Sequence, residues 1–478
     1  MLAFAPFAPD LAPTDTNASR VAKNVLPTAS GYGPMPSLQA YSTQALAARA
    51  IGFTIARTTS GGWSIYAGTT TKLYRFASGA WDDATRTSGG DYSVGTDELW
   101  SFAQFGDYCY ACAPSNALQR IAVTAGTDFA AVGGTPPNAR NLAVVGDFLV
   151  LASLASDPKA IHWSDINDPT NWSTGLSDSQ SFPDGGDVTG VAGGEVGYVL
   201  QEYAIRRMRF LPGSDYVFTF ERVVDGKGCV APWGFATVGG VVYFIAEDGF
   251  YSYSAQGLNP LGANRVNRWF QANTDVARIN QVQCIADPVR PRVYWAAYAT
   301  SGSSVYDRLI CYDWQLDRFT YGEVSADVWA SFASPGTSLD DLTTAIDSMT
   351  TSFDSRAYLG GRPALGAINS SHQLATLEGQ PLEATIETQE GHLVPGMRSF
   401  VNGVYPVVDT TAATIRVGSR ERVQDAVAYS ASVAIERDGW AKPRASGRLH
   451  RVEVTIPAGS TWTHAQGVDP QFRPMGAR

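Results

Sequence analysis

The chain has 478 residues, and its 35 Lys and Arg against 45 Asp and Glu give a formal net charge of −10. This charge excludes a generally basic nucleic-acid-binding protein, and no stretch reaches the ~18 apolar residues of a membrane-spanning helix. The sequence contains 47 Gly, 26 Pro, 21 Tyr, 21 Phe and 12 Trp. Turn formers and aromatic residues in these numbers predict many short strands and few helices.

The first 50 residues lack the basic start and the continuous apolar core of a signal peptide. Pro6, Pro9 and Pro13 disfavour a helix, so residues 1–50 are expected to form an extended arm. The five cysteines are odd in number and scattered, which argues against a disulfide scaffold and indicates folding in a reducing compartment.

Residues 51–335 repeat one plan at intervals of about 40–50 residues, the length of a propeller blade. Each unit has an apolar β-prone run, a tight turn and a second run with aromatic residues. The units are Gly61–Phe76, Leu99–Ala113, Asn141–Ser153, Val188–Phe210, Trp233–Ser254 and Val282–Tyr298. Successive strand–turn–strand units predict an all-β fold, a β-propeller of about six blades. An array of β-sandwiches is the alternative.

Residues 336–376 have a different pattern and are interpreted as a connecting acidic segment. Within Ser338–Tyr358, apolar residues recur every seven positions, each followed by an aspartate: Asp340, Asp347 and Asp354. A short amphipathic helix or a regular loop explains the pattern. A metal site is disfavoured because this spacing separates helical carboxylates by ~10 Å.

Residues 377–478 return to the period-two alternation of strands and are expected to form an additional C-terminal β domain. Residues 379–478 contain 11 Lys and Arg and 10 Asp and Glu, so they carry +1 and the preceding residues carry −11. This asymmetry predicts that the two parts face different environments.

No catalytic or cofactor-binding motif stands out, and we predict no catalytic residue, metal or cofactor. The histidines form no HExxH or HxH pair, and the chain has no GxSxG, P-loop or strand-linked GxGxxG. Cys109 and Cys112 form a CxxC, but an alternating strand directs them to opposite faces. Carboxylates of a glycosidase pair cannot be assigned, since nothing distinguishes an acid from a nucleophile.

Arginine provides 30 of the 35 basic residues. In the run IRRMRF, strand alternation puts Arg207 and Arg209 on one face and Arg206 on the other. Arginine suits bidentate pairing with carboxylates, so these three are predicted to lie at a subunit interface.

Several motifs in one order resemble a known family. The stretch IHWSDINDPTNW (Ile161–Trp172) is followed by YVLQEYAIRRMRFLPG, GKGCVAP and VVYFIAEDGFYSYS. Further matches are IYAGTTTKLYRFASGAW, LWSFAQFGDYCYA, the Leu339–Gly361 stretch and GRLHRVEVTIPAGSTWTHAQGVD (Gly447–Asp469). Together they resemble the tail nozzle proteins of short-tailed bacteriophages, also called tail tubular protein B or packaged-DNA stabilisation proteins. The N-terminal arm shows no clear match.

The resemblance implies a structural virion protein, assembled in the bacterial host cytoplasm. Six copies typically form a ring below the portal and the head–tail adaptor. Expected partners are the adaptor ring, tail fibres or tailspikes, a distal tail tip or needle, and passing double-stranded DNA bound without sequence preference.

A DNA channel must not hold the phosphate backbone, so an acidic lining is expected. The candidate lining residues are Asp184, Asp187, Asp340, Asp341, Asp347 and Asp354. A gate of flexible loops would retain the genome. The loops Pro183–Asp187 and Ala192–Gly197 are candidates, with Gly185, Gly186, Gly193 and Gly194 as their flexible points.

Two other functions remain open. One is a carbohydrate-binding or glycan-cleaving propeller of a phage tail, which predicts clustered carboxylates and exposed Trp in one pocket. The other is a cellular propeller that binds proteins. The mass of the purified particle would distinguish a ring from either.

Overall fold

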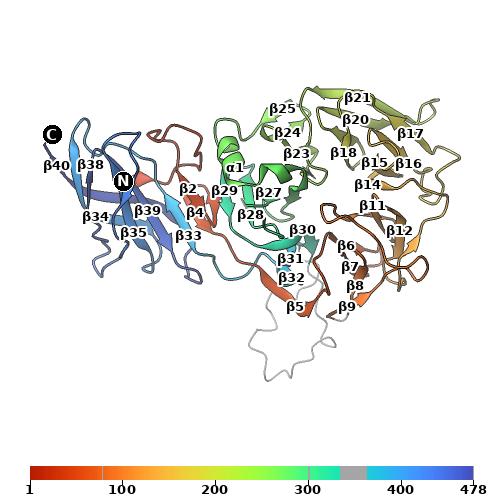
Figure 1. The fold of residues 1–478 in the computed structure, drawn as a ribbon, viewed down its shortest axis with the longest axis horizontal. Helices are drawn as coiled ribbons and strands as arrows, with labels where there is room; N and C mark the ends of the chain where they lie inside the picture. Colours follow the sequence, from red (N-terminus) through yellow and green to blue (C-terminus); the bar gives the residue numbers. More distant parts are fainter. Residues whose placement is uncertain (78, 300–301, 334–362, 477–478) are drawn as a thin grey trace, which may run out of the picture.

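The structure is a computed structural model that describes residues 1–77, 79–299, 302–333 and 363–476. Figure 1 shows two lobes, with a β-propeller on the right and a C-terminal β lobe on the left. Within the described residues, helix is confined to α1 (Asn267–Asn273) and the 3-10 helix η1 (Val276–Gln281). The all-β class predicted from the sequence is therefore confirmed.

Four-stranded antiparallel meanders make up the propeller lobe, seven of them in the described ranges. The first three consist of β6 (Phe53–Arg57), β7 (Trp63–Gly68), β8 (Leu73–Ala77), β9 (Ala80–Asp83), β10 (Ser101–Phe105), β11 (Tyr108–Ala113), β12 (Asn116–Ala122), β13 (Ala130–Ala131), β14 (Ala139–Val145), β15 (Phe148–Leu154), β16 (Ala160–Trp163) and β17 (Asp178–Ser181). The next three consist of β18 (Val188–Ala192), β19 (Gly197–Gln201), β20 (Ala204–Phe210), β21 (Phe218–Asp225), β22 (Phe235–Val238), β23 (Val241–Ala246), β24 (Gly249–Ser254), β25 (Gly257–Pro260), β26 (Gln283–Ala286), β27 (Arg292–Ala297), β28 (Arg308–Asp313) and β29 (Arg318–Gly322).

The first strands of successive meanders pack against one another in a closed cycle, with β30 (Ala326–Ala333) returning to β6. Side-chain amides reinforce this ring. Gln104 accepts a hydrogen bond from the Arg57 amide of the preceding blade at 2.8 Å. Gln283 donates to the Trp329 carbonyl at 2.6 Å and accepts from its amide at 2.9 Å. In both places, a glutamine side chain of one blade hydrogen-bonds to the backbone of a neighbouring blade.

The seventh blade corrects the predicted count of about six. It pairs β30, β31 (Pro363–Asn369) and β32 (Gln373–Thr376) with β5 (Gln39–Ala45) of the N-terminal arm. The propeller therefore extends past the predicted boundary at residue 335 and includes part of the predicted connecting segment 336–376. The sequence could not predict this blade because its outermost strand, β5, is separated from its partner β32 by about 330 residues. No local sequence pattern relates two strands so far apart.

A buried carboxylate fixes this closure. Asp327 is fully buried, and its Oδ2 accepts hydrogen bonds from the Ala50 amide at 3.1 Å and from His372 Nδ1 at 2.5 Å. Burial raises the pKa of Asp327, against the opposing effect of the His372 bond. One side chain of β30 thus ties the arm to the β31–β32 turn of the seventh blade.

Two sheets form the C-terminal lobe. The first has the order β3 (Val25–Thr28), β4 (Gly31–Pro34), β40 (Ala465–Met475), β34 (Arg398–Val408) and β38 (Ala445–Gly447), with β1 (Leu2–Ala3) beside β40. The second contains β2 (Val21–Lys23), β33 (Ala384–Glu387), β39 (Leu449–Ile456), β35 (Thr414–Arg420), β36 (Ala428–Tyr429) and β37 (Val433–Ala434). Their facing side chains share one apolar cluster, as in a sandwich.

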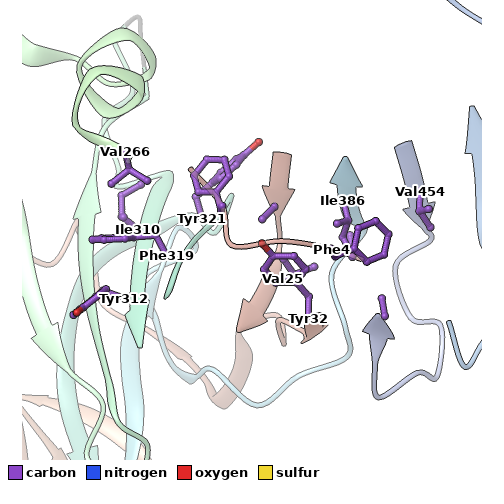
Figure 2. Close-up of a cluster of buried hydrophobic side chains, with 14 of the residues drawn as sticks. Phe4, Val25, Tyr32, Val266, Ile310, Tyr312, Phe319, Tyr321, Ile386 and Val454 are labelled. Atoms are coloured by element: carbon purple, nitrogen blue, oxygen red, sulfur yellow. The ribbon is translucent and has the colours of Figure 1, made fainter. Parts of the chain in front are cut away.

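The two lobes are joined by a continuous sheet. β2 pairs in parallel with β29 of the sixth blade and antiparallel with β33, so ten strands form one sheet across the seam. Figure 2 shows the apolar side chains that follow it, from Phe319 and Tyr321 through Val25 and Tyr32 to Ile386. The predicted second domain is thus packed against the propeller through strands of the N-terminal arm.

Asn24 connects both lobes at this seam. It is 6% exposed and adopts a positive φ of 55°. Its Oδ1 accepts a hydrogen bond from the Glu323 amide at 2.7 Å, and its Nδ2 donates to the Glu383 carbonyl at 2.9 Å. The short side chain therefore satisfies one backbone group at the end of the propeller and one at the entry to the C-terminal lobe.

Replacing Asn24 with Ala is expected to destabilise the seam. Asn264, with a φ of 58° and an exposed side chain, is the matched control for backbone strain. Asn24→Ala should lower the free energy of unfolding by about 1–2 kcal/mol more than Asn264→Ala, because two partly buried backbone groups lose their partners. Denaturant unfolding followed by tryptophan fluorescence measures both variants. Equal losses would show that the two bonds contribute nothing.

Candidate functional sites

The loop Pro183–Asp187, a predicted gate, is held closely by the neighbouring hairpin. Gln201 Nε2 donates to the carbonyls of Asp184 and Gly186 at 2.8 and 2.9 Å. Gly185 and Gly186 have φ of 89° and 81°, and a Cβ on Gly185 would lie 2.9 Å from Gln201 Oε1. The absence of side chains at Gly185 and Gly186 lets the loop backbone pack closely against Gln201. The prediction had taken these glycines as flexible points of a gate.

Asp184 is bound by two arginines of the same blade. Its carboxylate lies 2.6 Å from Arg206 and 2.9 Å from Arg222. Burial alone would raise the pKa of Asp184, but the bond and charge of Arg206 outweigh it and the pKa is lowered. The charge of Asp184 is therefore compensated within the chain. Asp187 is half-buried, and its amide donates to Glu202 Oε2 at 3.2 Å.

The three arginines predicted to lie at a subunit interface, Arg206, Arg207 and Arg209, differ in exposure and in their partners. Arg206 is 9% exposed, bound to Gln201 and Asp184, and lies over the Phe182 ring, so its donors serve contacts within the chain. Arg207 pairs with Glu221 on the adjacent strand. Arg209 is exposed, which leaves it accessible to a second molecule.

The second predicted gate, at Gly193 and Gly194, lies at the opposite end of the propeller from Gly185. β18 separates the two loops, and its five residues span ~17 Å. Gly194 accepts from the Gly146 amide at 2.8 Å and donates to the Val144 carbonyl at 3.0 Å, so it rests on the third blade. A single gate at one end of the propeller cannot contain both loops.

Asp340, Asp341, Asp347 and Asp354 lie outside the described residues. The described chain stops at Ala333 and resumes at Pro363, which pair across β30 and β31. Ala333 and Pro363 lie at the connection between the first and second strands of their blade, and Gly193 and Gly194 lie at the same connection of the fourth blade. Ala333 and Pro363 thus lie at the same end of the propeller as the second gate loop.

The motif Ile161–Trp172 begins with β16 and continues into a loop of the third blade. Asp165 Oδ1 accepts from the amides of Ile166 and Leu176 at 2.9 Å each, and its Oδ2 accepts from Asn171 Nδ2 at 3.1 Å. Trp172 is buried and donates to the Pro169 carbonyl at 2.9 Å. These polar side chains hold a long loop in place, so the motif has a structural role.

The CxxC thiols lie in separate apolar clusters on opposite faces of β11, as the alternation predicts. Burial raises the pKa of both Cys109 and Cys112. Such thiols are poor nucleophiles and poor metal ligands. Among the described residues, no group of three or more His, Cys, Asp or Glu side chains is arranged to hold a metal ion.

A polar cluster lies in the C-terminal lobe beside the seam. Glu387 and Glu390 are almost fully buried and pair with Arg451 and Arg420, respectively. Arg416 binds Glu453 with two bonds of 2.6 and 2.8 Å. Burial raises the pKa of Glu387 despite the charge of Arg451. The pairs compensate each other's charge inside the lobe.

A hollow of about 460 Å³, here called the seam pocket, opens next to this cluster. Its lining includes Arg20 of the arm, Arg268 and Trp269 of α1, and Glu387 and Arg451 of the C-terminal lobe. Sequence reasoning did not find these residues. They come from three distant segments, and only Arg451 lies in one of the motifs, Gly447–Asp469.

No protein-family model and no curated protein matches the chain. Among solved structures, the extracellular domain of a hybrid two-component system from B. thetaiotaomicron has a TM-score of 0.43 and 11% identity, over 81% of this chain and 45% of that one. This chain thus spans less than half the length of that protein. The C-terminal WD40 domain of Sif2 has a TM-score of 0.37 and 12% identity, over 74% of this chain and 94% of its own. These scores are low, and the propeller is assigned from the sheet topology of the chain itself.

None of the helices in the described ranges has the length and apolarity that crossing a membrane requires.

Acidification is expected to destabilise the fold through His450, which is buried, and His162, which is half-buried. His450 is 3% exposed, and burial lowers its pKa below the ordinary value of 6.5. A group with a depressed folded pKa binds protons more weakly in the folded state, so stability falls as pH drops below 6.5 towards the folded value. The free energy of unfolding between pH 7.5 and 5.5 should decline less in His450→Gln than in the unmodified chain. His162, whose pKa is also lowered by burial, provides a second variant. Identical slopes in all three proteins would contradict this assignment.

Proposed function

We propose that this chain is a structural subunit of the tail nozzle of a short-tailed bacteriophage. In this proposal about six copies form a ring below the portal and adaptor, and the ring retains and later releases the genome. The observation that carries it is the ordered series of motifs from Ile65 to Asp469, which spans both lobes. A continuous sheet through the seam supports the same idea, since it suits a wall element that resists pressure.

The proposed partners are further copies of the chain, the adaptor ring, tail fibres or tailspikes, and a distal tip or needle. Double-stranded DNA passes without sequence-specific binding, and the site of action is the virion. An acidic lumen would repel phosphates and let the duplex slide. Since the charge of Asp184 is compensated by Arg206 and Arg222, the proposed lining depends on Asp187 and on the four aspartates of the 338–358 segment.

The alternative is a carbohydrate-binding or glycan-cleaving part of a phage tail. One observation favours it: a hollow of about 450 Å³ in the C-terminal lobe, lined by Tyr405, Thr410 and Thr411. The Trp440 ring lies 5.5 Å from that of Tyr405. An aromatic surface next to hydroxyl groups could bind a sugar.

The mass of the assembled protein distinguishes the two functions. The nozzle proposal predicts that the purified chain, alone or with its adaptor, forms a ring with about six times the 51.1 kDa of one subunit. Mass photometry and negative-stain images would measure this. A particle that stays at one subunit and loses saccharide binding on Trp440→Ala would favour the alternative.

Charge reversal in the acidic segment should slow DNA release. Changing Asp340, Asp341, Asp347 and Asp354 to Lys would create phosphate contacts, each of which strengthens DNA binding through counterion release. Ejection from purified virions, followed by a DNA-binding dye, should become slower and more dependent on salt. Asp82→Lys, on the outer strand β9 of the first blade, is the control. Ejection that is unchanged in the quadruple variant would count against the acidic lining.

A further inference from the structure

The seam pocket brings three guanidinium groups together from three separate segments. Arg20 belongs to the N-terminal arm, Arg268 to helix α1, and Arg451 to β39 of the C-terminal lobe. Trp269 and Val21 provide an apolar part of the lining. The volume of about 460 Å³ lies within the range of small-molecule sites.

The two carboxylates of this lining are already bound. Asp10 accepts hydrogen bonds from the amides of Arg268 and Trp269 at 2.8 Å each. Glu387 is 2% exposed and binds Arg451 Nη1 at 3.2 Å and the Tyr429 hydroxyl. The lining therefore has three positive and two negative side chains, and the negative ones have partners.

Arg20 and Arg268 differ from Arg451, which is the ion-pair partner of Glu387. Arg20 Nη1 donates to the Leu11 carbonyl at 3.0 Å, and Arg268 Nη2 donates to the Asp10 carbonyl. Within the described ranges, neither guanidinium lies within ion-pair distance of a carboxylate. Burial, and then the nearby charge of Arg451, lower the pKa of Arg20, and the charges of Glu387 and Glu390 oppose this shift in part. A half-buried cation without a directly paired carboxylate is unfavourable, and a bound anion would relieve this cost.

We propose that the seam pocket binds a small ligand through an oxyanion, a phosphate or a carboxylate, with Arg20, Arg268 and Arg451 as donors. Planar guanidinium groups bind such oxyanions with paired hydrogen bonds. Trp269 contacts the apolar part of the ligand. Because the donors come from the arm, the propeller side and the C-terminal lobe, the bound anion links all three and stabilises the seam. The site exists in the single chain and does not depend on the nozzle function.

Calorimetric titration of the full chain with inorganic phosphate and with citrate, at constant ionic strength, tests the proposal. Binding of either should be accompanied by a rise in melting temperature. The two titrations distinguish a phosphate from a carboxylate site. Arg268→Gln should weaken binding about tenfold or more through loss of a charge-assisted bond. Arg20→Gln should do the same, and Arg20→Lys should retain part of the affinity.

Arg209→Gln, an exposed arginine of the propeller, is the matched control and should bind as the unmodified chain does. Arg268 is exposed, so its variant keeps the test valid even if Arg20→Gln does not fold. Absence of binding to both anions, or equal affinity in Arg268→Gln and the unmodified chain, would overturn the site. Binding of a short DNA duplex that Arg268→Gln abolishes, without binding of either small anion, would overturn the small-ligand assignment.

Discussion

The rest of the structure depends on the way three residues of the arm, Val21–Lys23, complete a sheet between two lobes. Ala22 is fully buried in this position, and Asn24 next to it hydrogen-bonds to both sides. Because sheet hydrogen bonds are directional and the apolar cluster is continuous across the seam, neither lobe can rotate without exposing core side chains. The arm is therefore the element that makes one rigid body from the two lobes.

The same arm also closes the propeller. A ring of blades must join its last blade to its first, and here β5 supplies the outer strand of the seventh blade. Asp327 binds the arm and the β31–β32 turn together, at the cost of burying a carboxylate. The N-terminal segment thus has two structural tasks, one in each lobe. The predicted extended arm, residues 1–50, thus contributes strands to three different sheets.

The net charge of −10 does not show which acidic side chains are paired within the chain. Asp184, Glu387, Glu390 and Glu453 are all bound by arginines of the same chain, so their charges stabilise the fold. Arginine serves these pairs through its planar fork, which matches a carboxylate with two bonds. Only acidic residues outside such pairs can give a surface its negative potential. The arginines of these pairs are thus used within the subunit, whereas Arg209, one of the three predicted interface arginines, is exposed.

The sequence by itself determined the all-β class, the tight turn within units such as Asn141–Ser153, the opposite faces of Cys109 and Cys112, and the strands of the C-terminal lobe. These features depend on residues within a few positions of one another, where alternation and turn chemistry act directly. The seventh blade, the shared sheet, the pairing of Asp184 with Arg206 and Arg222, and the convergence of Arg20, Arg268 and Arg451 were decided only by the tertiary structure. Each of them joins segments that are distant in the chain, and the free energy that brings such segments together comes from packing across the whole fold, which no local pattern records.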